Sequence, residues 1–475
     1  MTLEPTVPLA SVLCAVRGDS ETIIVTALTR PGSGVSVARR CADLTELLAA
    51  AGAGAGTAAV ISADLPGIDR EAVAHLHEHG VRVVALADGQ SWLADRLRAI
   101  GIDVVLDEDT PASVLVETVR DEARGRGGGA GRSDGPGAPS SGRGPGRPGD
   151  EPPVPVESRR GRVLAVWGPT GAPGRTTVAV HLAAELAGLG PERRSRGRRS
   201  RGRGRRKEGP SSGAGSRPDD VLLVDADTYA GSVAQHLGLL DESSGIAAAA
   251  RSAGIGTLDL AGLARLAPEA VPHLRVLTGI ARAARWPELP GSSLDVVWEL
   301  GRALADWTVV DCGFGIEQDE LLTYDTRAPQ RNGATLSALA AADAVLVVGG
   351  SDAVGIQRLV RGLTELAESG AAAGALRVVV ANRVRASAAG PRPEAAVRDA
   401  LGRYGGVADL HALPDDRSTL DAVLLAGRTL AESAPEAPVR RAIAALAQRV
   451  RTELGAVPVA PAPGGPRERV REPAH

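Results

Sequence analysis

Hydrophobic residues gather in short runs along the chain, and stretches with helical spacing separate these runs. In the first part of the chain they predict strands at residues 9–16, 35–40, 58–63, 81–86 and 102–106. In the second part they predict strands at residues 163–167, 221–226, 274–279, 307–312, 344–350 and 376–382. The second set is almost uninterrupted in its apolar character, as expected of strands covered on both faces. Strands that alternate with helices predict an α/β fold, with helices on both faces of mostly parallel sheets.

Three stretches break this pattern. Residues 124–160 are rich in Gly, Pro, Ser and Arg and carry too few apolar side chains to offset the entropy of ordering, so we expect a disordered linker. Residues 191–218 predict a disordered, Arg-rich insertion, and the Pro-rich tail at 456–475 is expected to be disordered too. The predicted domains are therefore residues 1–123 and 161–455.

The insertion leaves a second interpretation open. Ten of the fifteen residues at 193–207 are basic, so this run could contact nucleic acid or an anionic membrane. A surface insertion is favoured, because no aromatic residues lie between the charges to stack on bases.

Composition narrows the class of protein. Hydrophobic residues make up 43% of the chain but aromatic residues only 2%, so the cores must consist of Ala, Val, Leu and Ile. Lys207 is the only Lys beside 53 Arg, which makes an Arg in place of a Lys less unusual here. The net charge of −3 indicates no polyanionic partner. Because the first residues lack a basic stretch, we expect no secretory signal, and no apolar run of the sequence approaches the ~20 residues of a membrane helix. We therefore expect a cytoplasmic protein with reduced thiols.

The sequence GPTGAPGRTT, residues 168–177, lies between a predicted strand and a predicted helix. It matches the phosphate-loop pattern G-x-x-x-x-G-K-[ST] at Gly174 and Thr176, but Arg175 replaces the Lys and a Pro replaces the first Gly. Gly171 and Gly174 permit the main chain to turn its N–H groups toward a phosphate, and the start of the helix adds positive charge. A guanidinium does not reach phosphates as an ammonium does, so the loop predicts binding rather than fast hydrolysis. Taken alone, the loop sequence also fits an ordinary turn between a strand and a helix.

Polar residues end three other predicted strands. Asp225 and Asp227 follow one strand, Asp311 ends a second and Asn382 ends a third. Because ligand sites of parallel sheets lie at the carboxyl ends of strands, we expect these side chains near the loop. Carboxylates beside a phosphate loop suit Mg²⁺, and an amide can contact a base edge. The segment HALPDD at 411–416 is expected to form a loop at the same edge. Each Asp alone also fits a solvated turn or a helix cap.

The order of these motifs resembles that of the MinD/ParA superfamily of P-loop ATPases. The stretch VLLVDADTYAGSVAQHLGL at 221–239 and the preceding β/α region are similar to the CpaE/TadZ branch, whose members act in assembly and polar placement of Flp/Tad-type pili. The resemblance covers most of residues 161–455. It implies a P-loop NTPase domain that binds ATP and Mg²⁺, forms a nucleotide-dependent homodimer and meets protein partners of a pilus or division machinery.

The resemblance also implies roles for individual residues. Phosphate contacts would come from the loop residues Gly171, Ala172, Pro173, Gly174, Arg175, Thr176 and Thr177. Thr176, Asp225 and Asp311 would hold the metal. Asp227 would orient the attacking water, with Arg175 as the second catalytic residue, and Asn382 would contact the adenine.

Two departures bear on hydrolysis of ATP to ADP and phosphate. Thr170 stands where the family carries the Lys that crosses to the partner's nucleotide, and Arg175 stands at the ordinary loop Lys. Both cations that would neutralise the transition state are thus missing or altered. The sequence leaves turnover open, and we expect a nucleotide-binding switch with slow or absent hydrolysis.

The repeats of residues 1–123 resemble a response-regulator receiver, which has a flavodoxin-like fold. Asp64 follows the third predicted strand, where receivers carry their phospho-acceptor. Receivers also need an acidic pair after the first strand and a Lys after the fifth. Here only Asp19 lies near the first strand, and LDEDT at 106–110 follows the fifth. We therefore expect a protein-docking module rather than a phosphoryl acceptor.

The leading hypothesis is an ATP-dependent positioning factor of the MinD/ParA type, recruited to the cell pole, the septum or the inner membrane face. One alternative is an ATPase for septum-site selection or chromosome partitioning. Another is a pseudo-ATPase scaffold that binds nucleic acid through residues 193–207.

Overall fold

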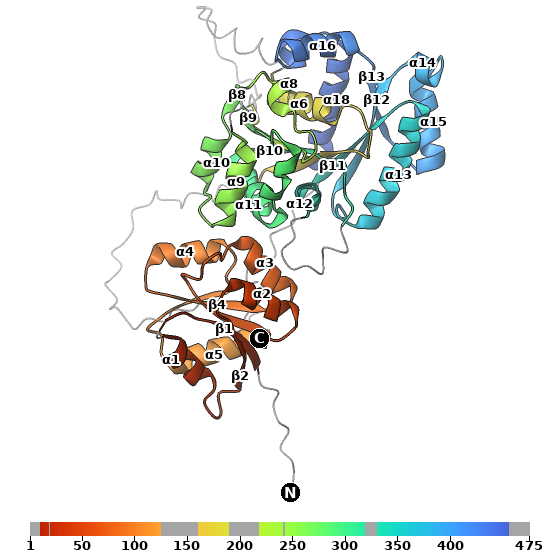
Figure 1. The fold of residues 1–475 in the computed structure, drawn as a ribbon. Helices are drawn as coiled ribbons and strands as arrows, with labels where there is room; N and C mark the ends of the chain where they lie inside the picture. The colour runs from red at the N-terminus through yellow and green to blue at the C-terminus, as the bar shows by residue number, and fades with distance from the viewer. Residues whose placement is uncertain are drawn as a thin grey trace, which may run out of the picture.

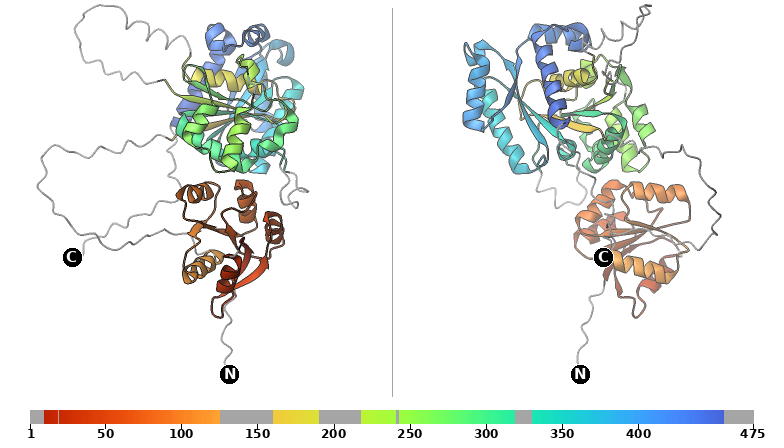
Figure 2. Two further views of the ribbon diagram at one scale, coloured as in Figure 1. Left: turned by 60° about the vertical axis from the view of Figure 1, so that its left-hand side comes forward. Right: turned by 180° about the vertical axis from the view of Figure 1, so that it is seen from behind.

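The computed structural model describes residues 10–18, 20–124, 160–189, 218–240, 243–318 and 330–455 (Figures 1 and 2). Within these ranges the chain forms two β-sheets, each with helices on both faces, which confirms the predicted α/β fold class. The predicted linker and insertion lie outside the described residues except at their ends, and the tail lies outside them entirely.

The first sheet has five parallel strands in the order β2-β1-β3-β4-β5, the flavodoxin-like doubly wound order. Its strands are β1 (Ala10–Ala15), β2 (Val35–Arg40), β3 (Ala58–Ser62), β4 (Arg82–Ala87) and β5 (Val104–Asp107). Its helices are α1 (Ser20–Leu28), α2 (Leu44–Gly52), α3 (Arg70–Glu78), α4 (Ser91–Ala99) and α5 (Ala112–Ala123). The strands lie within two residues of the predicted ranges, because each is a distinct apolar run.

The second sheet has eight strands in the order β13-β12-β11-β6-β10-β7-β9-β8, and only the β8–β9 pair is antiparallel. The strands are β6 (Arg162–Trp167), β7 (Val221–Ala226), β8 (Glu269–Val271), β9 (Leu274–Leu277), β10 (Trp307–Cys312), β11 (Ala344–Gly350), β12 (Leu376–Val384) and β13 (Leu410–Pro414). Alternate residues of β6 enter the cores on opposite faces, as the pleat requires.

Two of these strands were not predicted. The segment expected to be a loop at 411–416 begins with β13, which pairs with β12 at the edge of the sheet. Leu410 and Leu413 are buried there, but the strand is short and ends in Pro, which weakens its pattern. The other missed strand, β8, is shorter still and occupies the opposite edge.

The helices around the second sheet form one layer on each face. One core cluster holds residues of α9 (Gly245–Gly254), α10 (Leu260–Leu266), α11 (Gly291–Leu304), α12 (Gly333–Ala341), α13 (Ala353–Ser369) and α15 (Pro393–Gly405). The other holds residues of α6 (Arg175–Leu186), α8 (Val233–His236), α16 (Arg417–Leu425), α17 (Leu430–Ser433) and α18 (Pro438–Gly455). The described chain also contains η2 (Ala283–Glu288) and α14 (Ala386–Ala389). Every residue of α6 from Val178 to Leu186 is buried, so this helix is a rigid support for the loop before it.

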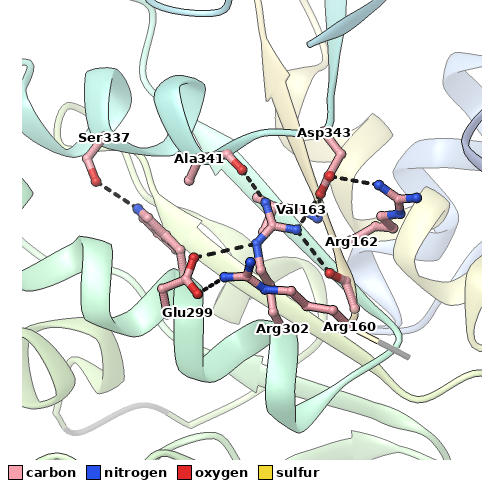
Figure 3. A network of polar contacts seen from close by, with 10 residues as sticks. Arg160, Arg162, Val163, Glu299, Arg302, Ser337, Ala341 and Asp343 are labelled. Atoms are coloured by element: carbon pink, nitrogen blue, oxygen red, sulfur yellow. Dashed lines mark hydrogen bonds and ion pairs between the residues drawn. The ribbon is translucent and has the colours of Figure 1, made fainter. Parts of the chain in front are cut away.

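A polar network joins the elements at the amino edge of the second sheet (Figure 3). Asp343, just before β11, accepts hydrogen bonds from Arg302 of α11 at 2.5 Å, from Arg162 of β6 at 3.0 Å and from Val163 N at 2.8 Å. Arg302 also donates to Ala341 O at 2.5 Å. The network thus fastens one helix to two neighbouring strands and leaves neither carboxylate oxygen of Asp343 unpaired.

Two further expectations concern the thiols and the helices. Cys14, Cys41 and Cys312 are free and buried, as expected of reduced thiols. Within the described ranges, no helix combines the length and apolar character that a membrane crossing requires.

The two sheets meet through helices on neighbouring layers. Helix α3 of the first part packs against α9 and α11 of the second. Beside this contact, Nε of Arg96 in α4 donates to Ile255 O, just after α9, at 3.1 Å.

Candidate functional site

The predicted phosphate loop connects β6 to α6 at the carboxyl edge of the second sheet. Gly171 and Gly174 adopt φ of 71° and 84°, the left-handed region that glycine enters without strain. The main-chain N–H groups of Gly171, Gly174, Arg175 and Thr176 donate no hydrogen bond to any residue that the structure describes. A helix start with free N–H groups attracts an anion, so the loop has the geometry of a phosphate cradle.

The predicted acids lie on the two strands next to this loop. In the order β6-β10-β7, Asp311 pairs in register with Asp225. Asp311 is fully buried, and neither of its carboxylate oxygens has a hydrogen-bond partner of ordinary distance and angle among the described residues, although the Thr176 hydroxyl lies close by. Asp225 accepts from Val233 N at 3.0 Å, and Asp227 accepts from Tyr229 N at 2.9 Å. The three carboxylates that were expected near the loop thus lie together at the carboxyl edge of the sheet.

Burial changes the acidity of these carboxyl groups. It raises the pKa of Asp225 to about 7, against the opposing effect of the Val233 and Asp227 N–H groups. It also raises the pKa of Asp311 well above its usual range, with the nearby Asp225 carboxylate adding to the rise, while Thr176 acts in the opposite direction. A cation placed between these carboxylates would stabilise their charged forms. It would therefore oppose both the effect of burial and the repulsion between the two carboxylates.

The donor set fits Mg²⁺ that arrives with a nucleotide. Within the described ranges, no three or more His, Cys, Asp or Glu side chains are grouped to hold a metal ion by themselves. Mg²⁺ commonly takes one or two carboxylates and completes its shell with water and phosphate oxygens. Asp311, which has no other partner in the part of the chain that the structure describes, meets that need together with Asp225 and the Thr176 hydroxyl.

Arg175 makes contacts within the protein rather than standing free in the loop. Its Nε donates to Cys312 O at 3.2 Å, and its Nη2 lies 3.5 Å from Oδ2 of Asp227. Both side chains are largely buried, at 15% and 5% exposed. The two residues expected to be catalytic therefore neutralise each other.

Asn382 ties β12 to the loop. Its Nδ2 donates to Pro173 O at 2.9 Å, and its Oδ1 accepts from Arg383 N at 2.9 Å. Arg383 has a φ of 59°, rare for a side chain other than glycine, and the register of β12 against β13 shifts here. Such strain is typical of functional sites. The late Asn thus positions the loop, which the sequence pattern did not indicate.

A cavity of about 200 Å³ opens beside the loop and Asn382. Its lining includes Thr177 and the acids Asp415 and Asp416 that follow β13. The sequence indicated these acids only as part of a loop at the same edge, because β13 was not predicted.

Two histidines that the sequence analysis missed also line this cavity. His181 accepts from Leu430 N at 3.3 Å. Burial lowers the pKa of His181 to about 3 and lowers the pKa of His236 as well, so both rings are neutral at physiological pH. His181 lies one helical turn after Thr177 and His236 lies nine residues after Asp227, but neither belongs to a motif, so the sequence gave no signal for them beyond helical spacing.

The carboxyl edge of the first sheet lacks a comparable assembly. Asp64 lies at the surface, and its carboxylate is 3.7 Å from Arg17, at the end of β1 where receivers place acids. Asp19 lies outside the described residues. The exposed pair gives no indication of a metal site, so Asp64 as a phospho-acceptor stays a disfavoured prediction.

No protein-family model matches the chain, and a search of curated proteins gave no match. Solved structures with a similar fold include the cell division ATPase MinD of Pyrococcus furiosus, at 19% identity and a TM-score of 0.44, covering 62% of this chain and 99% of that one. A ParA family ATPase from Chlorobium tepidum matches at 17% identity and a TM-score of 0.46, covering 62% and 100%. MinD of Pyrococcus horikoshii complexed with Mg-ADP matches at 18% and 0.44, covering 62% and 97%. At these values we argue function from the residues of the site itself.

Proposed function

We propose that this chain is an ATP-binding positioning factor of the MinD/ParA type with slow or absent hydrolysis. The observation that carries the proposal is a loop whose N–H groups have no partner among the described residues, directly beside a buried carboxylate, Asp311, that accepts no hydrogen bond of ordinary geometry from them either. A triphosphate with Mg²⁺ satisfies both sets of groups at once, because phosphate accepts from the N–H groups and the cation binds the carboxylate.

In this proposal, different residues of the chain hold different parts of the ligand. The loop residues Gly171, Ala172, Pro173, Gly174, Arg175, Thr176 and Thr177 hold the phosphates. Thr176, Asp225 and Asp311 hold Mg²⁺, which supplies neutralising charge to the phosphates when bound. The cavity beside Asn382 takes the base, and Asp415 and Asp416 at its rim are placed to accept from an exocyclic amine.

Slow hydrolysis follows from the contacts of Arg175 and Asp227. A water-orienting acid needs a free oxygen, but both oxygens of Asp227 are engaged: Oδ1 by the N–H groups of Tyr229 and Ala230, and Oδ2 by Arg175. Arg175 must leave this pair before it can contact a phosphate. Turnover therefore costs the separation of a buried ion pair, which is unfavourable.

The narrower proposal places the chain in the CpaE/TadZ-like branch, in Flp/Tad pilus assembly. Its support is the motif version at residues 221–239 and the preceding β/α region, which we propose acts as a docking module for protein partners. Septum-site selection and chromosome partitioning remain the alternatives within the superfamily. The scaffold alternative depends on residues 193–207, which lie outside the described residues.

Calorimetry of the purified chain with Mg²⁺ and ATP tests the proposal. We expect binding by the wild type and a loss of roughly 100-fold or more for Gly174→Ala, because a Cβ there would overlap the Asn382 amide at a left-handed φ. Gly370→Ala is the matched control: its φ is 65°, but an added Cβ meets nothing within 4 Å. The control should bind ATP as the wild type does.

Absence of binding by the wild type would refute the proposal. An ATPase assay on the wild type and Asp227→Ala then separates a slow enzyme from a pure switch, since equal background rates indicate the switch. Foci of the tagged protein at the pole, at mid-cell or on the nucleoid separate the three cellular roles. Salt-sensitive DNA binding that disappears on deletion of residues 193–207 would instead support the scaffold.

A further inference from the structure

Helix α13 packs closely against Pro169 of the phosphate loop and against the end of β11. A Cβ on Gly362 would lie 2.8 Å from Cβ of Pro169, and a Cβ on Gly355 would lie 2.6 Å from the carbonyl carbon of Gly350. Leu359 is buried on the same face of the helix. These residues are spaced by three to four positions, so one face of α13 is held against the end of β11 and against Pro169 of the loop.

Arg358 extends from this part of α13 over the loop. A Cβ added to Gly171 would overlap the guanidinium of Arg358, so the cation lies directly above that glycine. Within the described residues, Arg358 forms no ion pair and no hydrogen bond. Arg175, in contrast, is paired with Asp227. The cation that is free to meet an anion at this loop therefore comes from a neighbouring helix.

We propose that Arg358 is a ligand of the outermost phosphate and acts within the same chain. This inference rests on the proposed function, namely that the loop holds a nucleoside triphosphate. The main chain at the start of α6 cradles the inner phosphates, and Gly171 lies three residues earlier, on the side of the outermost one. A guanidinium there donates charge-assisted hydrogen bonds to phosphate oxygens.

The position of Arg358 compensates for a residue that the loop lacks. Thr170, next to Gly171, carries no charge and is exposed. Because Arg358 belongs to the same chain, its contact needs no second protomer. Discrimination between a triphosphate and a diphosphate is then a property of one protomer and does not change with protein concentration.

Binding of Mg²⁺-AMPPNP and of Mg²⁺-ADP to the full chain tests this assignment. We expect Arg358→Ala to weaken AMPPNP binding by about 10-fold to 100-fold, the effect of one charge-assisted contact, and to change ADP binding by less than about twofold. Arg358→Lys keeps the charge and should recover part of the affinity for AMPPNP. Arg377→Ala is the control, because Arg377 is also exposed and lies at the amino end of β12, away from the loop.

Each other outcome overturns the assignment. Equal weakening of both nucleotides would make Arg358 a general support of the loop, and no weakening would place it outside the site. If the wild type binds neither nucleotide, the proposed function fails and the assignment fails with it. Thermal unfolding of each variant without nucleotide checks folding, and since Arg358 is exposed we expect the midpoint to stay within about 2 °C.

Discussion

The amino and carboxyl ends of the strands in the eight-stranded sheet each hold a carboxylate, and the two carboxylates have opposite surroundings. At the amino edge, Asp343 accepts hydrogen bonds from two Arg side chains and one main-chain N–H (Figure 3). At the carboxyl edge, Asp311 is completely buried and accepts none from the described residues. The first arrangement fastens elements together, whereas the second leaves a carboxyl group, unpaired within the described residues, that a ligand can pair.

Within one sheet, the paired carboxylate thus contributes to stability, whereas the unpaired carboxylate is available for binding. An unpaired buried polar group costs about 1 to 3 kcal/mol and a charged one more. A folded protein can keep an unpaired buried polar group at a binding site, because function requires it there. Where polar groups serve only stability, they are paired. The loop N–H groups and the guanidinium of Arg358, which have no partner among the residues that the structure describes, add to the contrast, since both also lie at the carboxyl ends of the strands.

The largest expected effect is at the amino edge. Asp343→Ala should lower the free energy of unfolding by about 3 kcal/mol, because it leaves Arg302 and Arg162 without their shared partner in a largely buried place. Urea denaturation measures this change. Glu299→Gln is the control: Glu299 contacts Arg302 and Arg160 in the same network but is 58% exposed, so its effect should stay within about 0.5 kcal/mol. Similar effects for the two variants would remove the basis of the comparison.

The second expected effect is an increase in the free energy of unfolding. Asp311→Asn removes a fully buried carboxyl group, and because its raised pKa makes folding less favourable at neutral pH, we expect the protein without nucleotide to gain about 1 to 2 kcal/mol. The same variant should lose at least about tenfold in Mg²⁺-dependent ATP affinity, since an amide is a poorer ligand for the cation. Thermal unfolding and calorimetry give the two values. Asp64→Asn, at the exposed edge of the first sheet, should change neither, and a destabilised Asp311→Asn would contradict the contrast between the edges.

The smallest expected effect is the pH dependence of the free energy of unfolding that arises from buried groups at the carboxyl edge. Asp225, with a pKa of about 7 against 3.8 when unfolded, binds its extra proton in the folded state, so its contribution to stability grows as pH falls from 7 toward 4. His181, with a pKa of about 3 against 6.5, binds its extra proton in the unfolded state, so its contribution is full above pH 6.5 and is lost as pH falls toward 3. In the wild type the two contributions oppose each other.

His181→Gln keeps an acceptor for Leu430 N and removes the second contribution. Relative to the wild type, its free energy of unfolding should rise by about 1 kcal/mol per pH unit as pH falls from 6.5 to 5. Urea denaturation across this range measures the difference. A constant difference between the two proteins would show that His181 is not held neutral by burial.

The strands illustrate how far local patterns predicted this fold. The apolar run at residues 344–350 is buried on both faces, and β11 covers it from end to end. The edge strand β13 was missed because Leu410 and Leu413 are its only fully buried residues among polar neighbours and a Pro. Its assignment depends on β12 lying beside it, which is a contact between segments far apart in the sequence.

The site shows the same division. The order of Gly174, Asp225, Asp311 and Asn382 along the chain was sufficient to predict that they meet, because each ends or follows a parallel strand. The pairing of Arg175 with Asp227 was not predictable, since it depends on the side-chain direction at two separate strand ends. Arg358 was not predictable either, because helical spacing does not indicate which Arg of α13 faces the loop.

The sequence by itself determined which segments become strands and helices and which polar residues reach the carboxyl edge, because burial of alternating or periodic side chains is a local property. Only the tertiary structure decided which of those polar groups are paired with one another and which stay free. Pairing depends on distances of a few ångströms between side chains of different elements, and packing sets those distances.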